Sequence, residues 1–132
     1  MTDTIRKYAL DKIQQKDFNC AKEYTLSMFS GKYKIVILYQ LHYDGKMRFG
    51  EIQKSLDNAT HKVLSQQLKE LAEDGLIDRH ESVVNNRKAV FYSLTTTGRS
   101  LMPIIDLMFS WGTNRLENLQ IDYTTQLVEK NI

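Results

Sequence analysis

Residues 60–77 read THKVLSQQLKELAEDGLI and carry the clearest secondary-structure signal of the chain. From His61 to Asp74 the apolar residues recur at helical spacing, and they are Leu64, Leu68, Leu71 and Ala72. Thr60 suits the N-cap because its hydroxyl can accept from an unpaired N–H of the next turn, and Gly75 is a typical stop. The stretch predicts an amphipathic helix whose leucine stripe faces a core and whose polar side faces outward.

The residues before this helix predict further helices. A modest helix is expected within residues 1–20, and a second begins at Cys20 and closes at Gly31. Residues 33–43 are apolar around much of a helix, which is typical of an element central to a core. A short helix over 48–56 follows and is broken by Asp57-Asn58-Ala59.

The residues after it predict a hairpin and a long final helix. Strands are expected over 76–83 and 89–94, joined through Asn85-Asn86 as turn residues. The final helix is expected from Thr95 to about Gln120, bent at Pro103 because the proline ring displaces a helical hydrogen bond. A trihelical unit followed by a hairpin is the winged helix-turn-helix arrangement, mainly α with a small β-hairpin wing, an α+β class.

Composition is typical of one soluble domain. The 132 residues are 42% hydrophobic and 26% charged, and the formal net charge of +2 permits nucleic-acid binding without arguing for it. No apolar run is long enough to cross a bilayer and the N-terminus lacks a secretory apolar stretch, so we expect a cytoplasmic protein with no membrane partner. The single cysteine excludes an internal disulfide, and the three histidines lack metal-ligand spacing. We therefore expect no metal and no cofactor.

A larger set of residues resembles the HxlR-type winged-helix transcriptional regulators, a family within the MarR-like superfamily. The resemblance spans roughly residues 20 to 112, and its elements are specific only in combination. They are Cys20, Glu23, Thr25-Leu26, Gly31-Lys32-Tyr33, Ile37-Leu38, Leu41, Arg48-Phe49, Glu51-Ile52, Leu64, Leu68, Leu71, Asp74-Gly75-Leu76-Ile77, Arg79, Tyr92-Ser93-Leu94-Thr95, Gly98, Leu101, Pro103 and Trp111-Gly112. The resemblance implies a cytoplasmic, dimeric DNA-binding regulator, often a repressor.

The resemblance also implies that dimerisation uses the two ends of the chain. The final helix independently carries more apolar surface than a terminal helix of so small a domain can bury alone. We accordingly expect a single domain over 1–132, with an N-terminal dimerisation arm at 1–19, a winged-helix core at 20–94 and a C-terminal dimerisation helix at 95–132. The expected dimerisation residues are Ile5, Tyr8, Leu101, Ile104, Ile105, Met108 and Trp111.

The polar side of the helix 61–73 is the candidate DNA-reading surface. With the leucines inward, helical geometry turns Lys62, Ser65, Gln66 and Lys69 outward. Glutamine can pair bidentately with adenine, and lysine can meet guanine or phosphate. Thr60 and His61 lie at the positive end of the helix, where N–H groups favour a phosphate. The expected partner is double-stranded operator DNA.

Other basic residues fall where a winged helix meets the DNA backbone. Lys32, Arg48, Arg87 and Lys88 can each neutralise a phosphate without reading sequence, the last two at the tip of the wing 83–88. A two-fold dimer predicts a pseudo-palindromic operator. The alternative interpretation is a winged-helix module that binds protein without direct DNA contact. Arg79, at the start of a strand, is expected to brace the wing.

Cys20 raises the question of an input signal. Redox- and electrophile-sensing members of the family that this chain resembles use a cysteine at this position, and a helix N-terminus stabilises a thiolate. One hypothesis is that an oxidant or electrophile modifies Cys20 and releases DNA. The other is that Cys20 is a packing residue, because free cysteine behaves as a small hydrophobe.

An enzyme is not expected. The sequence contains no nucleophile elbow, phosphate loop, metal signature or paired-cysteine redox motif. The aromatic residues around Trp111 resemble a ligand site only superficially, since at helical spacing they are typical of a core or dimer interface.

Overall fold

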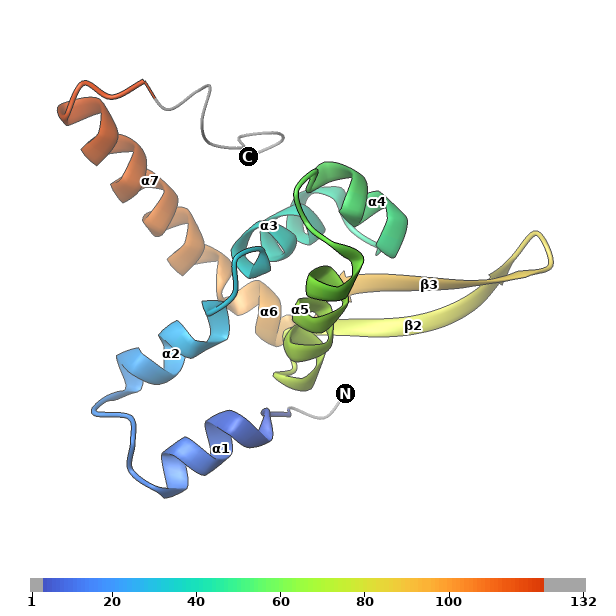
Figure 1. Cartoon of the computed structure of the whole chain (residues 1–132), viewed down its shortest axis with the longest axis horizontal. Coiled ribbons are helices and arrows are strands. Elements are labelled where there is room, and N and C mark those ends of the chain that lie inside the picture. Colours follow the sequence, from blue (N-terminus) through green and yellow to red (C-terminus); the bar gives the residue numbers. More distant parts are fainter. Residues whose placement is uncertain (1–3, 123–132) are drawn as a thin grey trace.

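The computed structural model describes residues 4–122 and has a helical body with a projecting hairpin (Figure 1). Its elements are α1 (Lys7–Gln14), α2 (Ala21–Phe29), α3 (Lys34–Asp44), β1 (Met47–Arg48), α4 (Phe49–Ser55), α5 (His61–Glu73), β2 (Ile77–Val84), β3 (Arg87–Leu94), α6 (Thr96–Ser100) and α7 (Met102–Asn118). Helices α3, α4 and α5 followed by the β2–β3 hairpin confirm the predicted winged-helix class. Within the described range, no helix is both long enough and apolar enough to span a bilayer.

The hydrophobic core lies where α3, α4 and α5 meet the base of the sheet. Its fully buried side chains include Ile37 and Leu38 of α3 and Ile52 of α4. The predicted leucine stripe of α5 is also buried, and it consists of Leu64, Leu68 and Leu71. Because a helix cannot rotate without exposing such a stripe, this packing fixes which side of α5 faces solvent.

Both ends of α5 form as their residues dictate. The Thr60 hydroxyl accepts from the backbone N–H of Val63 at 3.1 Å, which is the predicted N-cap. At the other end Gly75 has φ +77°, and the N–H of Leu76 bonds to the carbonyl of Leu71 at 3.0 Å. This Schellman motif needs a left-handed residue and explains the glycine. It also aims the chain directly into β2.

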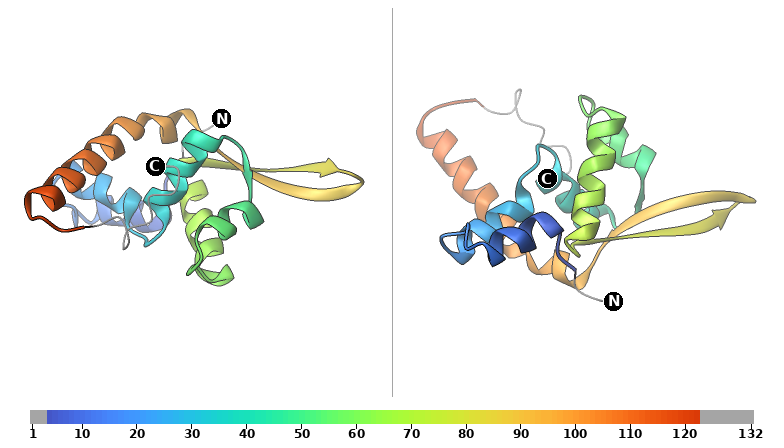
Figure 2. Two further views of the ribbon diagram at one scale, coloured as in Figure 1. Left: turned by 90° about the horizontal axis from the view of Figure 1, so that it is seen from above. Right: turned by 60° about the horizontal axis from the view of Figure 1, so that its bottom comes forward.

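The sheet has three antiparallel strands in the order β1-β3-β2. The wing turn is made by Asn85 and Asn86, which have φ of 53° and 63°, the paired positive values of a type I′ hairpin turn. Strand β3 is longer than predicted because its pairing begins at Arg87, whereas β2 has the predicted length and is shifted by one residue, to Ile77–Val84. Strand β1 was not predicted, since two residues are too few to show a period. The hairpin extends well clear of the helices in both views of Figure 2.

The prediction of one continuous final helix is wrong. The segment is divided into α6 and α7 at Leu101, and Pro103 lies in the first turn of α7 rather than at a bend within it. Proline is tolerated there because the first N–H groups of a helix have no intrahelical partner. Helix α7 then leaves the body on the side opposite to the wing (Figure 1).

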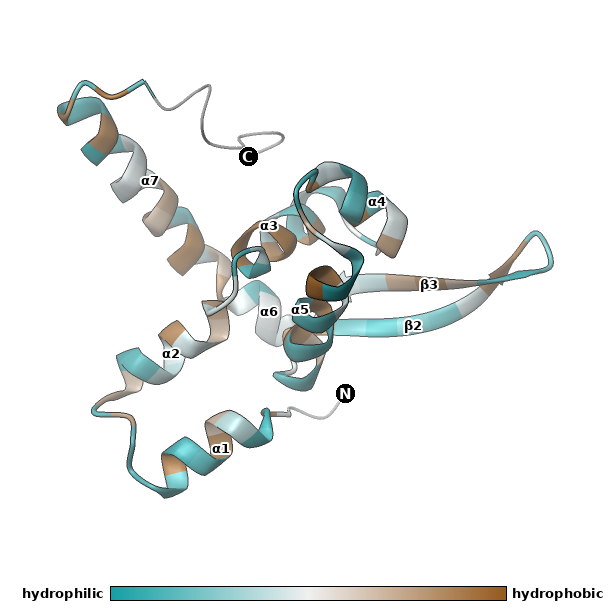
Figure 3. Ribbon diagram, viewed as in Figure 1, coloured by the Kyte–Doolittle hydropathy of each residue, from teal (hydrophilic) through white to brown (hydrophobic). Residues whose placement is uncertain are grey.

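Most apolar side chains of α7 are exposed in the single chain. Hydrophobic segments follow the projecting helix in Figure 3. Leu107 is 71% exposed and Trp111 is 70% exposed, with Ile104 and Met108 also exposed. Ile105 differs from the expectation, because it is only 2% exposed and belongs to the core of its own chain. It therefore offers no free surface to a second subunit.

The N-terminal arm lies against α2 and the end of α5. Tyr8 is exposed, Ile5 is half-buried and Leu101 is half-buried against the core. Phe18 packs edge-on against Tyr24 with ring centroids 6.1 Å apart. Of the residues expected at a dimer interface, Tyr8, Ile104, Met108 and Trp111 thus present the most free surface.

Candidate nucleic-acid interface

The outward side of α5 is polar and basic. Lys62, Gln66 and Lys69 are exposed, as are Thr60 and His61 at the first turn. These side chains face away from the buried leucines because residues of one helix face recur every three or four positions. The structure thus brings five of the six predicted α5 residues to one open surface.

Ser65, the sixth predicted residue, is less available. It is half-buried, and its hydroxyl lies 3.4 Å from Nδ1 of His61. The ring of His61 in turn packs on Phe49 of α4, with centroids 4.6 Å apart. These contacts orient both side chains near the start of α5.

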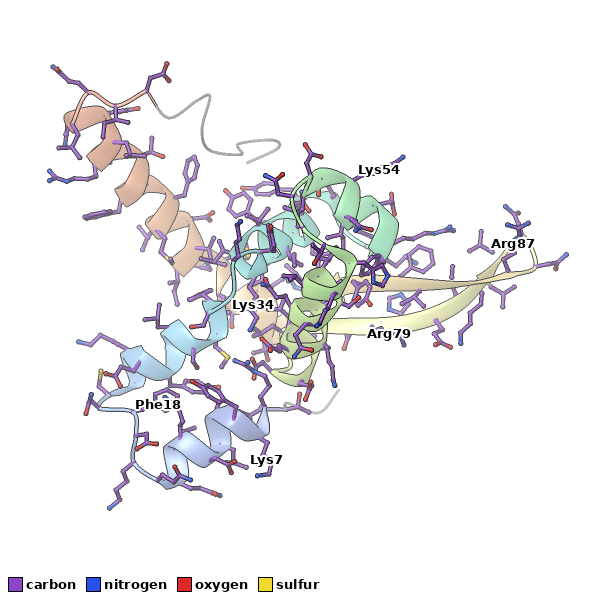
Figure 4. The ribbon with its side chains drawn as sticks, viewed as in Figure 1. Lys7, Phe18, Lys34, Lys54, Arg79 and Arg87 are labelled. Atoms are coloured by element: carbon purple, nitrogen blue, oxygen red, sulfur yellow. The ribbon has the colours of Figure 1, made fainter. Side chains whose placement is uncertain are left out.

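The wing tip carries two exposed cations. Arg87 projects at the end of the hairpin in Figure 4, next to Lys88. Lys88 Nζ lies 3.1 Å from Glu81 across the hairpin, and the same carboxylate is 3.4 Å from Nη1 of Arg79. These contacts within the β2–β3 hairpin agree with a bracing role for Arg79. Of the three cations Arg79, Arg87 and Lys88, they leave Arg87 without an ion pair in the part of the chain that the structure describes. The hydrogen bonds from Lys88 and Arg79 contribute to lowering the pKa of Glu81.

Two further residues predicted to contact the DNA backbone, Lys32 and Arg48, lie outside α5 and the wing. Lys32 is exposed at the turn before α3, with its ammonium 5.5 Å from the ring centre of Tyr33. Arg48 precedes α4, and its guanidinium lies over the ring of Phe91 at 5.1 Å. Sequence reasoning missed Lys46, which covers the same ring at 4.6 Å and adds a cation at the root of the wing.

A hollow of about 690 Å³ lies between α5, the root of the β2–β3 hairpin and the start of the N-terminal arm. Ser65, Lys69 and Glu73 line it from the helix, and Arg79 and Tyr92 line it from the strands. The candidate surface is therefore concave between α5 and the hairpin, and Lys69 and Arg79 are the basic residues that line this hollow.

Beneath the exposed side of α5 lies an ionic network that sequence reasoning missed. The ammonium of Lys34, a fully buried side chain, lies 2.7 Å from Glu70 Oε1. Arg6 lies 3.2 Å from the same oxygen and 2.8 Å from Oδ2 of the buried Asp74. Figure 4 shows Lys34 at the start of α3, beside α5. The signals in the sequence are a lysine at the start of an apolar helix and acids near the end of α5.

The network keeps Glu70 ionised. Partial burial raises the pKa of Glu70, but the ion pairs with Lys34 and Arg6 and the hydrogen bond from Gln66 outweigh it and hold the pKa below its ordinary value. The backbone N–H of Arg6 also donates to Asp74 at 3.0 Å. The N-terminal arm is thereby tied directly to the helix that carries the candidate DNA surface.

Cys20 is a free, exposed residue at the N-cap position of α2, where its side chain makes no capping hydrogen bond. Beside it, Glu23 accepts from the backbone N–H of Asn19 at 2.8 Å, and this bond is the main cause of a lowered pKa of Glu23. The exposure answers one requirement of a reactive thiol. Across residues 4–122, no three His, Cys, Asp or Glu side chains gather as a metal site requires.

Comparison with known proteins points to one family. The family model described as "HxlR-like helix-turn-helix" matches residues 28–120. The chain is 52% identical over 90 residues to the uncharacterized HTH-type transcriptional regulator YdzF of Bacillus subtilis, covering 68% of this chain and 82% of that protein. It is 38% identical over 122 residues to the HTH-type regulator YtcD of the same organism, covering 91% and 93%.

Solved structures agree with the sequence relatives. The redox regulator HypR in its reduced form superposes with a TM-score of 0.70 at 36% sequence identity. The superposition covers 76% of this chain and 98% of that chain.

Proposed function

Because the chain belongs to the HxlR-like helix-turn-helix family of transcriptional regulators, we propose that it is a homodimeric repressor of a pseudo-palindromic operator. Helix α5 enters the major groove of double-stranded DNA, and the wing 83–88 contacts the backbone. The observation that carries the proposal is the fixed orientation of α5, whose leucines are buried while Lys62, Gln66 and Lys69 are exposed. In this proposal the protein acts in the cytoplasm, where the chromosome lies, as a regulator and not as an enzyme.

Each part of the surface has a distinct role in this proposal. Gln66 reads a base edge, for which adenine is the bidentate partner of an amide. Lys62 and Lys69 meet guanine or phosphate, while Thr60 and His61 place the positive end of α5 against a phosphate. Lys32, Arg48, Arg87 and Lys88 neutralise phosphates, and Ser65 supports His61.

The homodimer is supported by apolar surface that the single chain leaves open. The exposed side chains of α7, Leu107 and Trp111 foremost, form a stripe on an element that projects from the body. Monomeric proteins rarely expose contiguous apolar surface of this kind, and a second copy would cover it. Two-fold pairing through α7 and Tyr8 of the arm would present two α5 helices to successive major-groove segments.

Selection of bound duplexes from a random pool tests the DNA-binding proposal. The wild-type chain should enrich a pseudo-palindrome whose half-sites lie about one or two helical turns apart. Lys62→Glu with Lys69→Glu should abolish enrichment, whereas Lys7→Glu on the outside of α1 is a matched control. Wild-type protein that enriches no sequence, or a double variant that binds as well as wild type, would favour the protein-binding alternative.

We also propose that Cys20 is the input of this regulator. The support is its exposure and the similarity of the chain to HypR, a redox regulator. With one cysteine per chain, oxidation by diamide would join Cys20 to the partner subunit's Cys20 or to a small thiol. Two thiols would then lose two protons and two electrons, and diamide would take them up as its hydrazine.

The test compares wild-type protein and Cys20→Ser before and after diamide. Operator affinity of the wild type should change on treatment and return with dithiothreitol, while the variant should not respond. Equal responses of both proteins would contradict a sensing role and leave Cys20 as an ordinary surface residue.

A further inference from the structure

Glu70 touches the residue that we assign to base reading. Its Oε2 accepts a hydrogen bond from Nε2 of Gln66 at 3.0 Å, one helical turn earlier. Its Oε1 is occupied on the inner side by Lys34 Nζ at 2.7 Å and Arg6 Nη1 at 3.2 Å. The two oxygens of one carboxylate thus join an internal ionic network to an exposed amide.

The network fixes the position of the carboxylate. Lys34 is fully buried, so its ammonium depends on Glu70 for a charge partner. The Arg6 side chain is only 12% exposed and is held by Asp74 and by the carbonyl of Ser27 at 3.1 Å. An ordinary surface glutamate would rotate freely, whereas Glu70 is held by contacts from α3 and from the N-terminal arm.

The orientation of the Gln66 amide follows from this. An ionised carboxylate only accepts hydrogen bonds, so the NH₂ group of Gln66, not its carbonyl oxygen, must face Glu70. The carbonyl oxygen is left as an open acceptor on the exposed side of α5, and Nε2 keeps one further hydrogen. Within residues 4–122 the structure gives that oxygen no donor.

We propose that Glu70 is a specificity-determining residue that acts through Gln66, holding its amide so that the carbonyl oxygen faces the base edges of the major groove. The inference rests on the proposed function, since it requires α5 to enter that groove. The position read by Gln66 then favours a base that donates there and disfavours one that only accepts.

The preferred base can be stated from the chemistry of the groove. Adenine offers its N6 amino group as a donor and N7 as an acceptor, which match the carbonyl oxygen and the remaining hydrogen on Nε2. Guanine offers only acceptors at N7 and O6, and its O6 would meet the carbonyl oxygen of Gln66. We expect adenine to be preferred over guanine by about ten-fold or more at this position.

Glu70→Gln gives the sharpest test, because it should reverse the preference. The amide oxygen of the new side chain would face Lys34 and Arg6, which only donate, and its NH₂ group would face Gln66. The Gln66 carbonyl would then turn inward and its NH₂ group outward, so guanine should gain over adenine at that position alone. Glu73→Gln makes the same chemical change on α5 at a residue without this bond to Gln66. Because Glu73 lines the hollow beside α5, its replacement can change overall affinity, but it should leave the adenine-to-guanine preference at the Gln66 position unchanged.

The experiment is selection from a random duplex pool with the full chain, followed by affinity measurements on operators that differ at one base pair. Gln66→Ala identifies the position, since discrimination should be lost only there. A Glu70→Gln protein that keeps the wild-type preference overturns the inference. No enrichment by the wild-type chain would instead reject DNA reading itself, which separates the two failures.

A second measurement covers the case in which Glu70→Gln does not fold. In the wild-type chain, the side-chain NH₂ resonance of Gln66, identified by its absence in Gln66→Ala, should shift as acid protonates Glu70. The Glu73→Gln chain should show the same shift. A Gln66 resonance that is insensitive to that titration would overturn the inference without any variant at Glu70.

Discussion

Helices α5 and α7 both carry apolar stripes, but only one stripe is buried within the chain. Leu64, Leu68 and Leu71 of α5 are inaccessible, whereas Leu107 and Trp111 of α7 are largely exposed. The hydropathy colouring of Figure 3 shows similar apolar segments on both helices. The difference teaches that periodicity identifies an apolar helix face but does not tell which molecule covers that face. The apolar face of α5 is covered by the core of its own chain, so its polar side is left facing solvent. For the apolar face of α7 we propose that a second copy of the chain covers it.

The largest expected effect is on the stability of the chain and comes from truncating a buried leucine of α5. Leu68→Ala should lower the free energy of unfolding by about 2–5 kcal/mol, because it leaves a cavity in a fully packed core. Denaturant unfolding of the purified protein measures it. Leu107→Ala on α7 is the matched control, measured at a dilution at which the subunits dissociate. It should leave the unfolding free energy of the single chain nearly unchanged, because Leu107 is exposed there. A loss of unfolding free energy as large as that of Leu68→Ala would contradict the distinction.

Reversing charge on the polar side of α5 should affect DNA and not folding. Lys62→Glu with Lys69→Glu should weaken operator binding on the order of a hundred-fold, since two phosphate-facing cations become repelling anions. The unfolding free energy should change by less than about 0.5 kcal/mol for each substitution, as both side chains are exposed. Binding titrations at fixed salt check the first statement and denaturant melts the second.

Truncating the α7 stripe should act on assembly. Trp111→Ala should weaken self-association by roughly ten-fold or more, because a large aromatic residue at an interface centre carries much of its energy. Sedimentation equilibrium over a range of concentrations measures the shift. Unchanged association of this variant would place the subunit interface elsewhere, whereas Ile105→Ala should instead lower the stability of the single chain.

The wing tip should contribute a smaller effect that is independent of sequence. Arg87→Ala should reduce the slope of log affinity against log salt by about one and weaken all duplexes alike. Lys88→Ala should do less in low salt, because Lys88 already pairs with Glu81. Base-specific weakening by Arg87→Ala would contradict a backbone contact.

The smallest expected effect is a pH dependence arising from Glu70. Its pKa is lowered in the folded chain, so its stabilising contribution is fully present above the pKa of an unfolded glutamate. That contribution is lost as the pH falls through the lowered folded value. Thermal melts of wild type and Glu70→Gln should therefore differ most near neutral pH and converge in acid. A difference that grows on acidification would contradict this sign.

Local signals allowed much of this fold to be predicted, and tertiary contacts account for what was missed. The cap at Thr60, the stop at Gly75 and the turn at Asn85-Asn86 act within a few residues, so their elements were found. Ile105 has the same apolar character as its exposed neighbours, and only the packing of α7 on α3 separates it from them.

The candidate site was likewise only partly predictable from the sequence. Its exposed residues follow from helical periodicity once the leucine stripe is known. The support beneath them joins Arg6, Lys34 and Glu70, which are far apart in sequence and meet only after folding. A lysine in the first turn of an apolar helix suggests a charged partner, but the sequence does not say which acid provides it.

Cross-linking from α5 to DNA tests the central claim most directly. A benzophenone attached at position 66 through Gln66→Cys, in a Cys20→Ser background, should label bases at two symmetric positions of the selected operator. The same probe at position 111, through Trp111→Cys, should label none. Retained operator binding with no cross-link from position 66, or equal labelling from position 111, would show that the polar side of α5 does not enter the groove.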